Sequence, residues 1–189
     1  LPRELEGLKI VQISDLHYSE LVSNNFLYRI SKQVLALKPD LIVFTGDFLS
    51  YSQLPEPERL KAFLTTLKAP LGTFAIYGNH DYNEYISLGS DGRFRKVESQ
   101  LPAIMRGFAR LFSVNDKNQE GAIVRAPVEE FAELKELLTE SSIHLLHNET
   151  IQIGKKNGCI NLTGLGDYMT GHCQPAIAFR NYDARIPGI

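Results

Sequence analysis

The stretch LKIVQISDLH, at residues 8–17, joins a short apolar run to polar residues that can bind cations. The run is rich in β-branched side chains, which favours a buried strand, and Asp15 and His17 follow it directly. Two further stretches repeat this arrangement: LIVFTGD at residues 41–47 and TFAIYGNHD at residues 73–81. Apolar residues at helical spacing separate the three stretches. They include Phe26, Ile30 and Val34 within residues 25–37, and a second series within residues 60–67. This alternation predicts an α/β fold whose parallel strands end side by side in three polar loops.

The second half of the chain predicts one more helix and three short strands. Pro127, with Glu129 and Glu130 close behind it, is typical of a helix start. The strands are expected at residues 143–146, 149–153 and 159–163. Asn157-Gly158 suits a tight turn between the last two. We therefore expect one domain over residues 1–189, an α/β sandwich of sheets and helices.

Each of the three early strands runs into side chains that can hold a metal ion. These candidates are Asp15, His17, Asp47, Asn79, His80 and Asp81. Asp15 and His17 are two residues apart in an extended segment, so their side chains point the same way. Carboxylate, imidazole and amide ligands together suit a divalent cation such as Mn²⁺, Fe²⁺, Mg²⁺ or Zn²⁺. Two such ions about 3.5–4 Å apart can activate water and stabilise an in-line displacement at phosphorus.

Each motif also has a plain structural explanation when it stands alone. An Asp-x-His after a strand is often a capped loop, and Gly46-Asp47 is a common kind of turn. The run Gly78-Asn79-His80-Asp81 is harder to explain by structure alone. All three motifs occur in order at strand ends, and this combination favours a metal site.

These motifs, DLH, GD and GNHD, resemble the first three motifs of the calcineurin-like metallophosphoesterases, and IVQISDLH is most similar to their membrane-associated bacterial branch. The resemblance covers residues 7–83 strongly and 127–168 more loosely. It implies a sandwich of two mixed β-sheets flanked by helices and a site with two divalent ions, Mn²⁺ first among the candidates. It further implies roles for the metal ligands: Asp15 and His17 bind the first ion, Asp47 bridges both ions, and Asn79 binds the second. By the same resemblance, His80 stabilises the transition state or protonates the leaving oxygen, and Asp81 orients His80.

The sequence departs from the family pattern after residue 168. Gly171-His172-Cys173-Gln174 begins like the family's Gly-His-x-His motif, but Gln174 replaces the second histidine, so we interpret His172 as a loop residue. Asp167 either lines the site or caps a turn. Two other histidines are expected to be structural or exposed: His144 and His147. We expect the remaining ligands to follow Ile189, so that the fold is incomplete at the C-terminus of this chain.

Residues 84–126 are expected to be an insertion in the family fold. The segment is locally basic, and an apolar stripe at 3–4 residue spacing runs over 101–112 with Arg106 and Arg110 off it. A basic amphipathic helix suits a lid that meets acyl chains, a membrane surface or a phosphate-rich substrate, and Arg106 and Arg110 are then candidate substrate-binding residues. The alternative is an ordinary helix that packs its stripe on the domain.

The bulk properties favour some classes of partner over others. The formal charge of −2 argues mildly against nucleic acid, and the two cysteines do not form a disulfide scaffold. The resemblance implies a hydrolase of phosphoester or pyrophosphate bonds, with a membrane-lipid precursor such as UDP-2,3-diacylglucosamine as the specific expectation. A broad phosphodiesterase acting on soluble or envelope substrates and a non-catalytic scaffold are the alternatives. We expect a cytoplasmic protein, peripheral to the inner membrane or anchored there by segments outside this chain.

Overall fold

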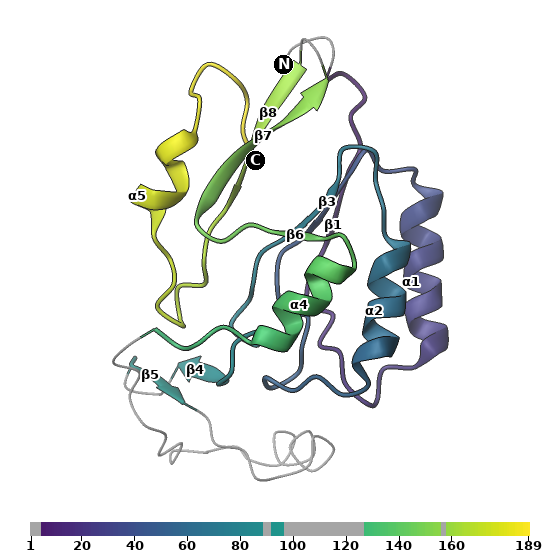
Figure 1. Ribbon diagram of the computed structural model, residues 1–189, viewed down its shortest axis with the longest axis vertical. Helices are drawn as coiled ribbons and strands as arrows, with labels where there is room; N and C mark the ends of the chain where they lie inside the picture. The colour runs from purple at the N-terminus through teal and green to yellow at the C-terminus, as the bar shows by residue number, and fades with distance from the viewer. Residues whose placement is uncertain (1–4, 89–91, 97–126, 156–157) are drawn as a thin grey trace.

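A four-stranded parallel sheet forms the centre of the computed structural model, which describes residues 5–88, 92–96, 127–155 and 158–189 (Figure 1). Its strands lie in the order β1 (Ile10–Ile13), β2 (Leu41–Phe44), β3 (Thr73–Ala75) and β6 (His144–Leu145). All three neighbouring pairs are parallel. The predicted parallel sheet and its strand positions are therefore confirmed.

Helices cover one face of this sheet (Figure 1). They are α1 (Asn24–Ala36), α2 (Pro57–Thr66) and α4 (Ala132–Glu140). Alternate strand residues face them, as the period of a β-strand requires. Ile42 and Phe44 of β2 belong to the apolar cluster beneath the helices, whereas Leu41 of the same strand packs in a second cluster on the opposite face.

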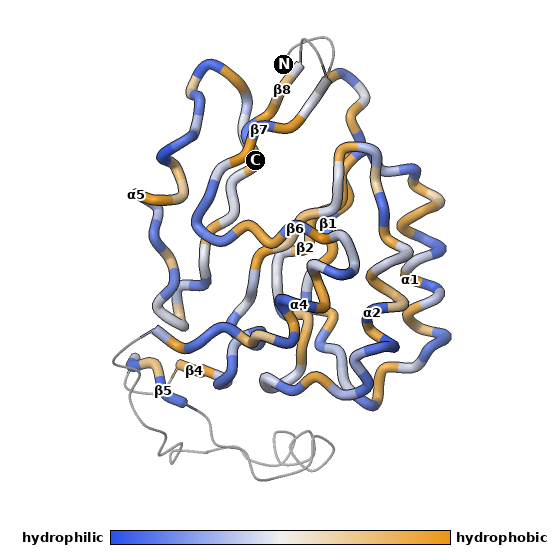
Figure 2. Tube along the Cα trace, in the orientation of Figure 1, coloured by the Kyte–Doolittle hydropathy of each residue, from blue (hydrophilic) through white to orange (hydrophobic). Residues whose placement is uncertain are grey.

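A second sheet covers that opposite face. It consists of β7 (Glu149–Lys155) and β8 (Gly158–Gly164), which pair as an antiparallel hairpin. Ile160 and Leu162 of β8 pack with Leu41 and Phe74 of the first sheet, so apolar side chains join the two layers. Figure 2 shows this pattern as apolar colour along the central strands.

A short helical segment and the last residues complete the second layer. Here α5 (Pro175–Ala178) and η2 (Phe179–Asn181) lie against β7, and Thr150 donates its hydroxyl to the carbonyl of Ala178. Gly188 pairs in parallel with Asn161 of β8. The expected α/β sandwich is confirmed: the first sheet is parallel in the described residues, and the second combines an antiparallel hairpin with a parallel bridge.

Two local predictions were wrong. The helix predicted to start at Pro127 begins at Ala132, because residues 127–131 are extended and make main-chain hydrogen bonds with two other loops. The N–H of Val128 donates to Thr170, and the carbonyl of Glu129 accepts from Asn83. In α1 the buried side chains include Leu27 and Val34, while the predicted Phe26 lies about half exposed.

The described part of the expected insertion begins with a small hairpin. It comprises β4 (Ile86–Leu88) and β5 (Phe94–Lys96), paired antiparallel. Ile86 is fully buried in the main core and anchors the hairpin to the domain. The predicted amphipathic helix, with Arg106 and Arg110, lies outside the described residues. Of the helices that the structure describes, none has the length and apolar character needed to cross a bilayer.

Candidate metal centre

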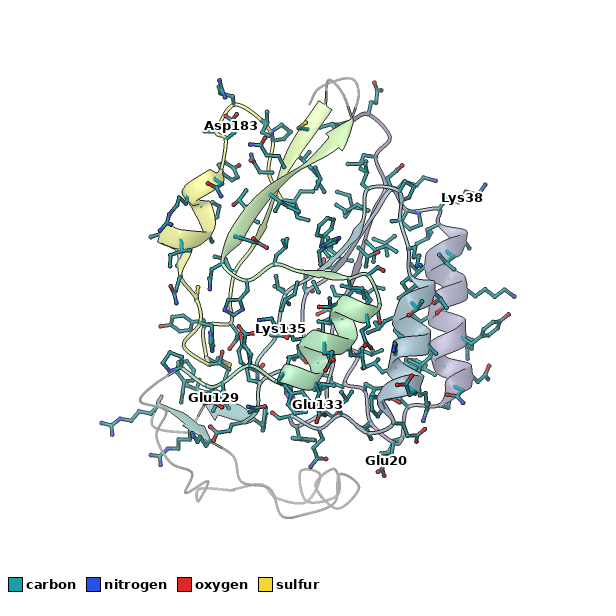
Figure 3. The ribbon with its side chains drawn as sticks, in the orientation of Figure 1. Glu20, Lys38, Glu129, Glu133, Lys135 and Asp183 are labelled. Carbon is teal, nitrogen blue, oxygen red and sulfur yellow. The ribbon has the colours of Figure 1, made fainter. Side chains whose placement is uncertain are left out.

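The three polar loops meet at the carboxyl end of the parallel sheet. Figure 3 marks this end by Glu20, in the loop after β1, and the opposite end by Lys38, which precedes β2. The chain after β1 continues alongside the chain after β2: Asp15 N–H donates to Gly46, and His17 N–H donates to Asp47 at 2.9 Å. The pairing of the strands is thereby extended into the loops, which places both candidate ligand groups side by side.

Two glycines allow the second and third loops to approach each other. A Cβ atom on Gly46 would lie 2.2 Å from the main-chain nitrogen of Gly78, and Gly46 has a left-handed φ of +92°. A Cβ on Gly78 would lie 2.1 Å from Oδ1 of Asp47. Real Cβ atoms do not come so close to other atoms, so glycine at both positions is a geometric requirement of the site.

The first three candidate ligands all have unusual backbone conformations. Asp15, His17 and Asp47 have φ values of 55°, 43° and 56°, in the left-handed region that non-glycine residues rarely adopt. Such strain persists only where surrounding contacts enforce it, and it concentrates at functional sites.

The side chains of these residues converge. Nε2 of His17 lies 3.6 Å from Oδ1 of Asp15 and 3.8 Å from Oδ2 of Asp47. Ligands at about 2.0–2.2 Å from one ion and roughly at right angles or wider lie about 3–4 Å apart, so the spacing of each of these two pairs would allow a shared cation. Ligand atoms of His17, Asp47 and His80 also lie within 4.8 Å of one another. Burial raises the pKa of the Asp47 carboxyl, while the nearby N–H of His80 and the imidazole of His17 oppose that shift.

Asn79 and Asp81 are held by main-chain groups. The side-chain nitrogen of Asn79 donates to the carbonyl of Ile86 at 3.1 Å, which directs its amide oxygen away from that contact. Asp81 is fully buried, and its two carboxylate oxygens accept from the N–H groups of Leu49 and Gly78, each at 3.0 Å. Burial raises the pKa of Asp81 to about 7. Asp81 therefore ties the loop after β2 to the loop after β3.

Asp167 and His172 belong to a neighbouring turn. Oδ1 of Asp167 accepts from the N–H of Thr170 at 2.8 Å, which is a turn-capping contact, although the carboxylate is also close enough to Asp47 to raise its pKa. The ring of His172 stacks on Tyr82 at 4.8 Å, and its Nε2 lies 2.6 Å from the carbonyl of Val128. The prediction that His172 is a loop histidine is confirmed.

Two residues of the site were not found from the sequence. Tyr51 and Tyr85 lie around the ring of His80, with ring centroids 5.8 Å and 4.3 Å away. Neither belongs to a ligand-type motif, and their spacing from His80 along the chain carries no recognisable period. Only the folded arrangement of the loops shows their proximity.

The comparison with known proteins identifies the class. The calcineurin-like phosphoesterase family model matches residues 8–172, and the chain belongs to this family of metal-dependent hydrolases. The three loop motifs that converge in the structure all fall within the matched region.

Several individual proteins are similar to the chain. The UDP-2,3-diacylglucosamine pyrophosphatase LpxG of Chlamydia muridarum is 36% identical over 188 residues, which are 98% of this chain and 56% of that protein. LpxG of Chlamydia trachomatis serovar D is 37% identical over the same shares. An uncharacterized metallophosphoesterase of Bacillus subtilis, YkuE, is 38% identical over 86 residues, 45% of this chain and 30% of that protein. The chain thus spans a little over half the length of the two LpxG proteins.

Proposed function

We propose that the protein to which this chain belongs hydrolyses the pyrophosphate bond of UDP-2,3-diacylglucosamine or of a closely related nucleotide-lipid. The convergence of Asp15, His17 and Asp47 at one end of the sheet carries the reaction class. The similarity to two LpxG proteins over 98% of the chain supports the substrate. Because the chain covers 56% of those relatives, the activity of the whole protein rests on both arguments together.

The proposed ligands divide between two divalent ions. Asp15 and His17 would hold the first ion, Asp47 would bridge both, and the amide oxygen of Asn79 would contribute to the second. When bound, the ions supply Lewis-acid stabilisation of charge at phosphorus and lower the pKa of water. Mn²⁺ is our first candidate, and Fe²⁺, Zn²⁺ and Mg²⁺ suit the same mixture of oxygen and nitrogen ligands.

His80 and Asp81 supply the protein's own chemistry in this proposal. His80 stabilises the charge that develops at the leaving oxygen or protonates that oxygen, because a ring nitrogen lies within 4.8 Å of the ligand atoms of His17 and Asp47. Asp81 supports it indirectly, since its carboxylate fixes the turn on which His80 stands.

The lipid part of the proposal depends on the basic insertion. Arg106 and Arg110 would bind the phosphate groups of the substrate, and the apolar stripe beside them would meet acyl chains at the membrane surface. The protein would then act at the cytoplasmic face of the inner membrane.

Full-length protein with Mn²⁺ tests the proposal directly. UDP-2,3-diacylglucosamine and bis(p-nitrophenyl) phosphate are offered separately, and release of UMP or p-nitrophenol is measured. Turnover of the lipid at a much higher kcat/KM than the simple diester supports the specific substrate; the reverse preference indicates a broad phosphodiesterase.

Asp47→Asn is the control for the metal mechanism. It keeps the size of the side chain and removes the charge of the proposed bridging ligand. We expect it to cost more than the roughly 10–100-fold that loss of a residue supporting a metal ligand costs. Wild-type turnover by Asp47→Asn would exclude a bridging role.

A further inference from the structure

The two histidines of the centre make opposite hydrogen bonds with one short segment, residues 49–51. Nδ1 of His17 lies 3.3 Å from the main-chain carbonyl of Leu49. Nδ1 of His80 lies 3.3 Å from the main-chain N–H of Tyr51, which donates to it. The same loop after β2 therefore contacts the same ring atom of both histidines, once with an acceptor and once with a donor.

The chemistry of the partners fixes the proton on each ring. A carbonyl oxygen only accepts, so His17 carries its proton on Nδ1 and has a lone pair on Nε2. A main-chain N–H only donates, so neutral His80 uses its Nδ1 lone pair and carries its proton on Nε2. An imidazole binds a cation through an unprotonated nitrogen, hence His17 is suited to be a ligand and His80 to be a donor. The group of His17, Asp47 and His80 is thus divided into two ligands and one proton donor.

The segment that makes these contacts is itself strongly held. Leu49 is fully buried, and its N–H donates to Asp81 at 3.0 Å. Ser50 donates its hydroxyl to the carbonyl of His17 at 2.8 Å. Tyr51 and Ser52 then adopt two successive left-handed conformations, with φ of 54° and 55°. These contacts on both sides of the loop enforce a backbone shape that aims the Tyr51 N–H at His80.

A second element holds the ring of His80 against that N–H. Tyr85 packs on the imidazole with centroids 4.3 Å apart and an interplanar angle of 36°. Tyr51 meets Tyr85 edge-on at 5.4 Å, so the two tyrosines and His80 form one group of rings. Tyr85 directly precedes the buried Ile86, whose carbonyl accepts from Asn79, so its backbone is fixed next to the site.

We propose that Tyr85 is a positioning residue that holds His80 on the Tyr51 N–H, with the Nε2 proton presented to the leaving oxygen. This inference rests on the proposed hydrolysis and adds the element that keeps the proton donor oriented. In the reaction, water adds to phosphorus and the P–O bond to the leaving group breaks. The leaving oxygen keeps the bonding pair, and the Nε2–H of neutral His80 donates a hydrogen bond that stabilises its charge. The oxygen then takes a proton from solvent, to which the attacking water has lost one. The packed ring of Tyr85 restricts rotation of His80 away from the Tyr51 N–H.

Two esters of uridine 5′-monophosphate with different leaving groups test this role. Full-length protein with Mn²⁺ is assayed on the phenyl ester, whose leaving oxygen needs its charge stabilised, and on the p-nitrophenyl ester, whose leaving group departs readily as an anion. We expect Tyr85→Leu to lower kcat about tenfold or more on the phenyl ester and little on the p-nitrophenyl ester. KM and the Mn²⁺ concentration for half activation should stay near the wild-type values, and Tyr85→Phe should restore kcat because it restores the ring. Tyr28→Leu is the matched control, the same change on the exposed face of α1, and should leave both rates unchanged.

Several outcomes would overturn the inference. An equal loss on both esters would mean that Tyr85 shapes the site without acting through the proton donor. No loss on either ester, or a failure of Tyr85→Phe to restore the rate, would exclude positioning by the ring. Failure of the wild-type protein to hydrolyse UDP-2,3-diacylglucosamine as well as both esters would instead overturn the proposed function, on which this inference depends.

Discussion

Gly46→Ala is the substitution whose effect follows most directly from the structure. The new methyl group would lie 2.2 Å from the nitrogen of Gly78, so the loops after β2 and β3 must move apart. Forcing a backbone contact of this kind costs about 1–3 kcal/mol, and holding alanine at φ +92° costs about 1–2 kcal/mol. We therefore expect about 2–5 kcal/mol of destabilisation, together with loss of phosphodiesterase activity because Asp47 is displaced.

Gly7→Ala is the matched control for this prediction. Gly7 also has a left-handed φ, +79°, but a Cβ there would meet nothing within 4 Å. It should cost only about 1 kcal/mol, the conformational part alone. Urea unfolding of both full-length variants in the presence of a chelator compares them without contributions from bound metal. If both substitutions lowered the unfolding midpoint equally, the close approach of the two loops would play no part in stability and the reasoning would be wrong.

Two further substitutions test other parts of the fold. Asn161 is fully buried, and its side chain forms hydrogen bonds with main-chain groups of Asp183 and Ile186. Asn161→Leu should therefore destabilise the protein by about 1–3 kcal/mol and speed tryptic cleavage at Arg185. Unchanged cleavage would contradict this anchoring role. Burial lowers the pKa of His147 from its ordinary value of about 6.5. The imidazole of the unfolded chain therefore binds a proton more readily than that of the native protein. As a result, the free energy of unfolding decreases as the pH falls below about 6.5. His147→Leu should therefore show a smaller drop in its urea midpoint between pH 7 and pH 5 than the wild type, and a drop of equal size would exclude His147 as a contributor.

The sequence predicted the central sheet and the gathering of the candidate ligand residues because both follow from local patterns. Apolar runs ending in Asp15, Asp47 and Asn79 required only that the strands be parallel and adjacent, and the structure has that register. The start of α4 was mispredicted because Pro127 and two glutamates are compatible with a helix start. In the structure, main-chain hydrogen bonds to the carbonyl of Thr170 and from the N–H of Asn83 hold the segment extended. Helix propensity predicts a helix start poorly where the main-chain hydrogen-bond partners of the segment lie far away in the sequence.

The contacts that set the chemistry of the site were beyond the reach of motif analysis. Tyr85 is close to His80 only because Ile86 is buried and Asn79 bonds to its carbonyl. The orientation of His80 by Asp81 stays a prediction. In the structure the Asp81 carboxylate accepts from the N–H of Leu49, a contact that no motif implies. Such contacts depend on how two loops cross in space, which a linear pattern does not encode.

The loop after β2 makes different hydrogen bonds with His17 and His80, and this difference supports the different roles proposed for the two histidines. Both His17 and His80 follow strand ends and both stand among carboxylates, so residue type cannot distinguish them. The carbonyl of Leu49 and the N–H of Tyr51 do distinguish them, because one demands a proton on Nδ1 and the other excludes it. Apart from proline at position 51, which lacks the N–H, a change of side chain leaves these main-chain groups in place, so this difference is built into the loop conformation. The left-handed backbone conformations of Tyr51 and Ser52 then have a structural reason. They maintain the different hydrogen bonds of the two histidines, whose ring centroids lie 4.7 Å apart.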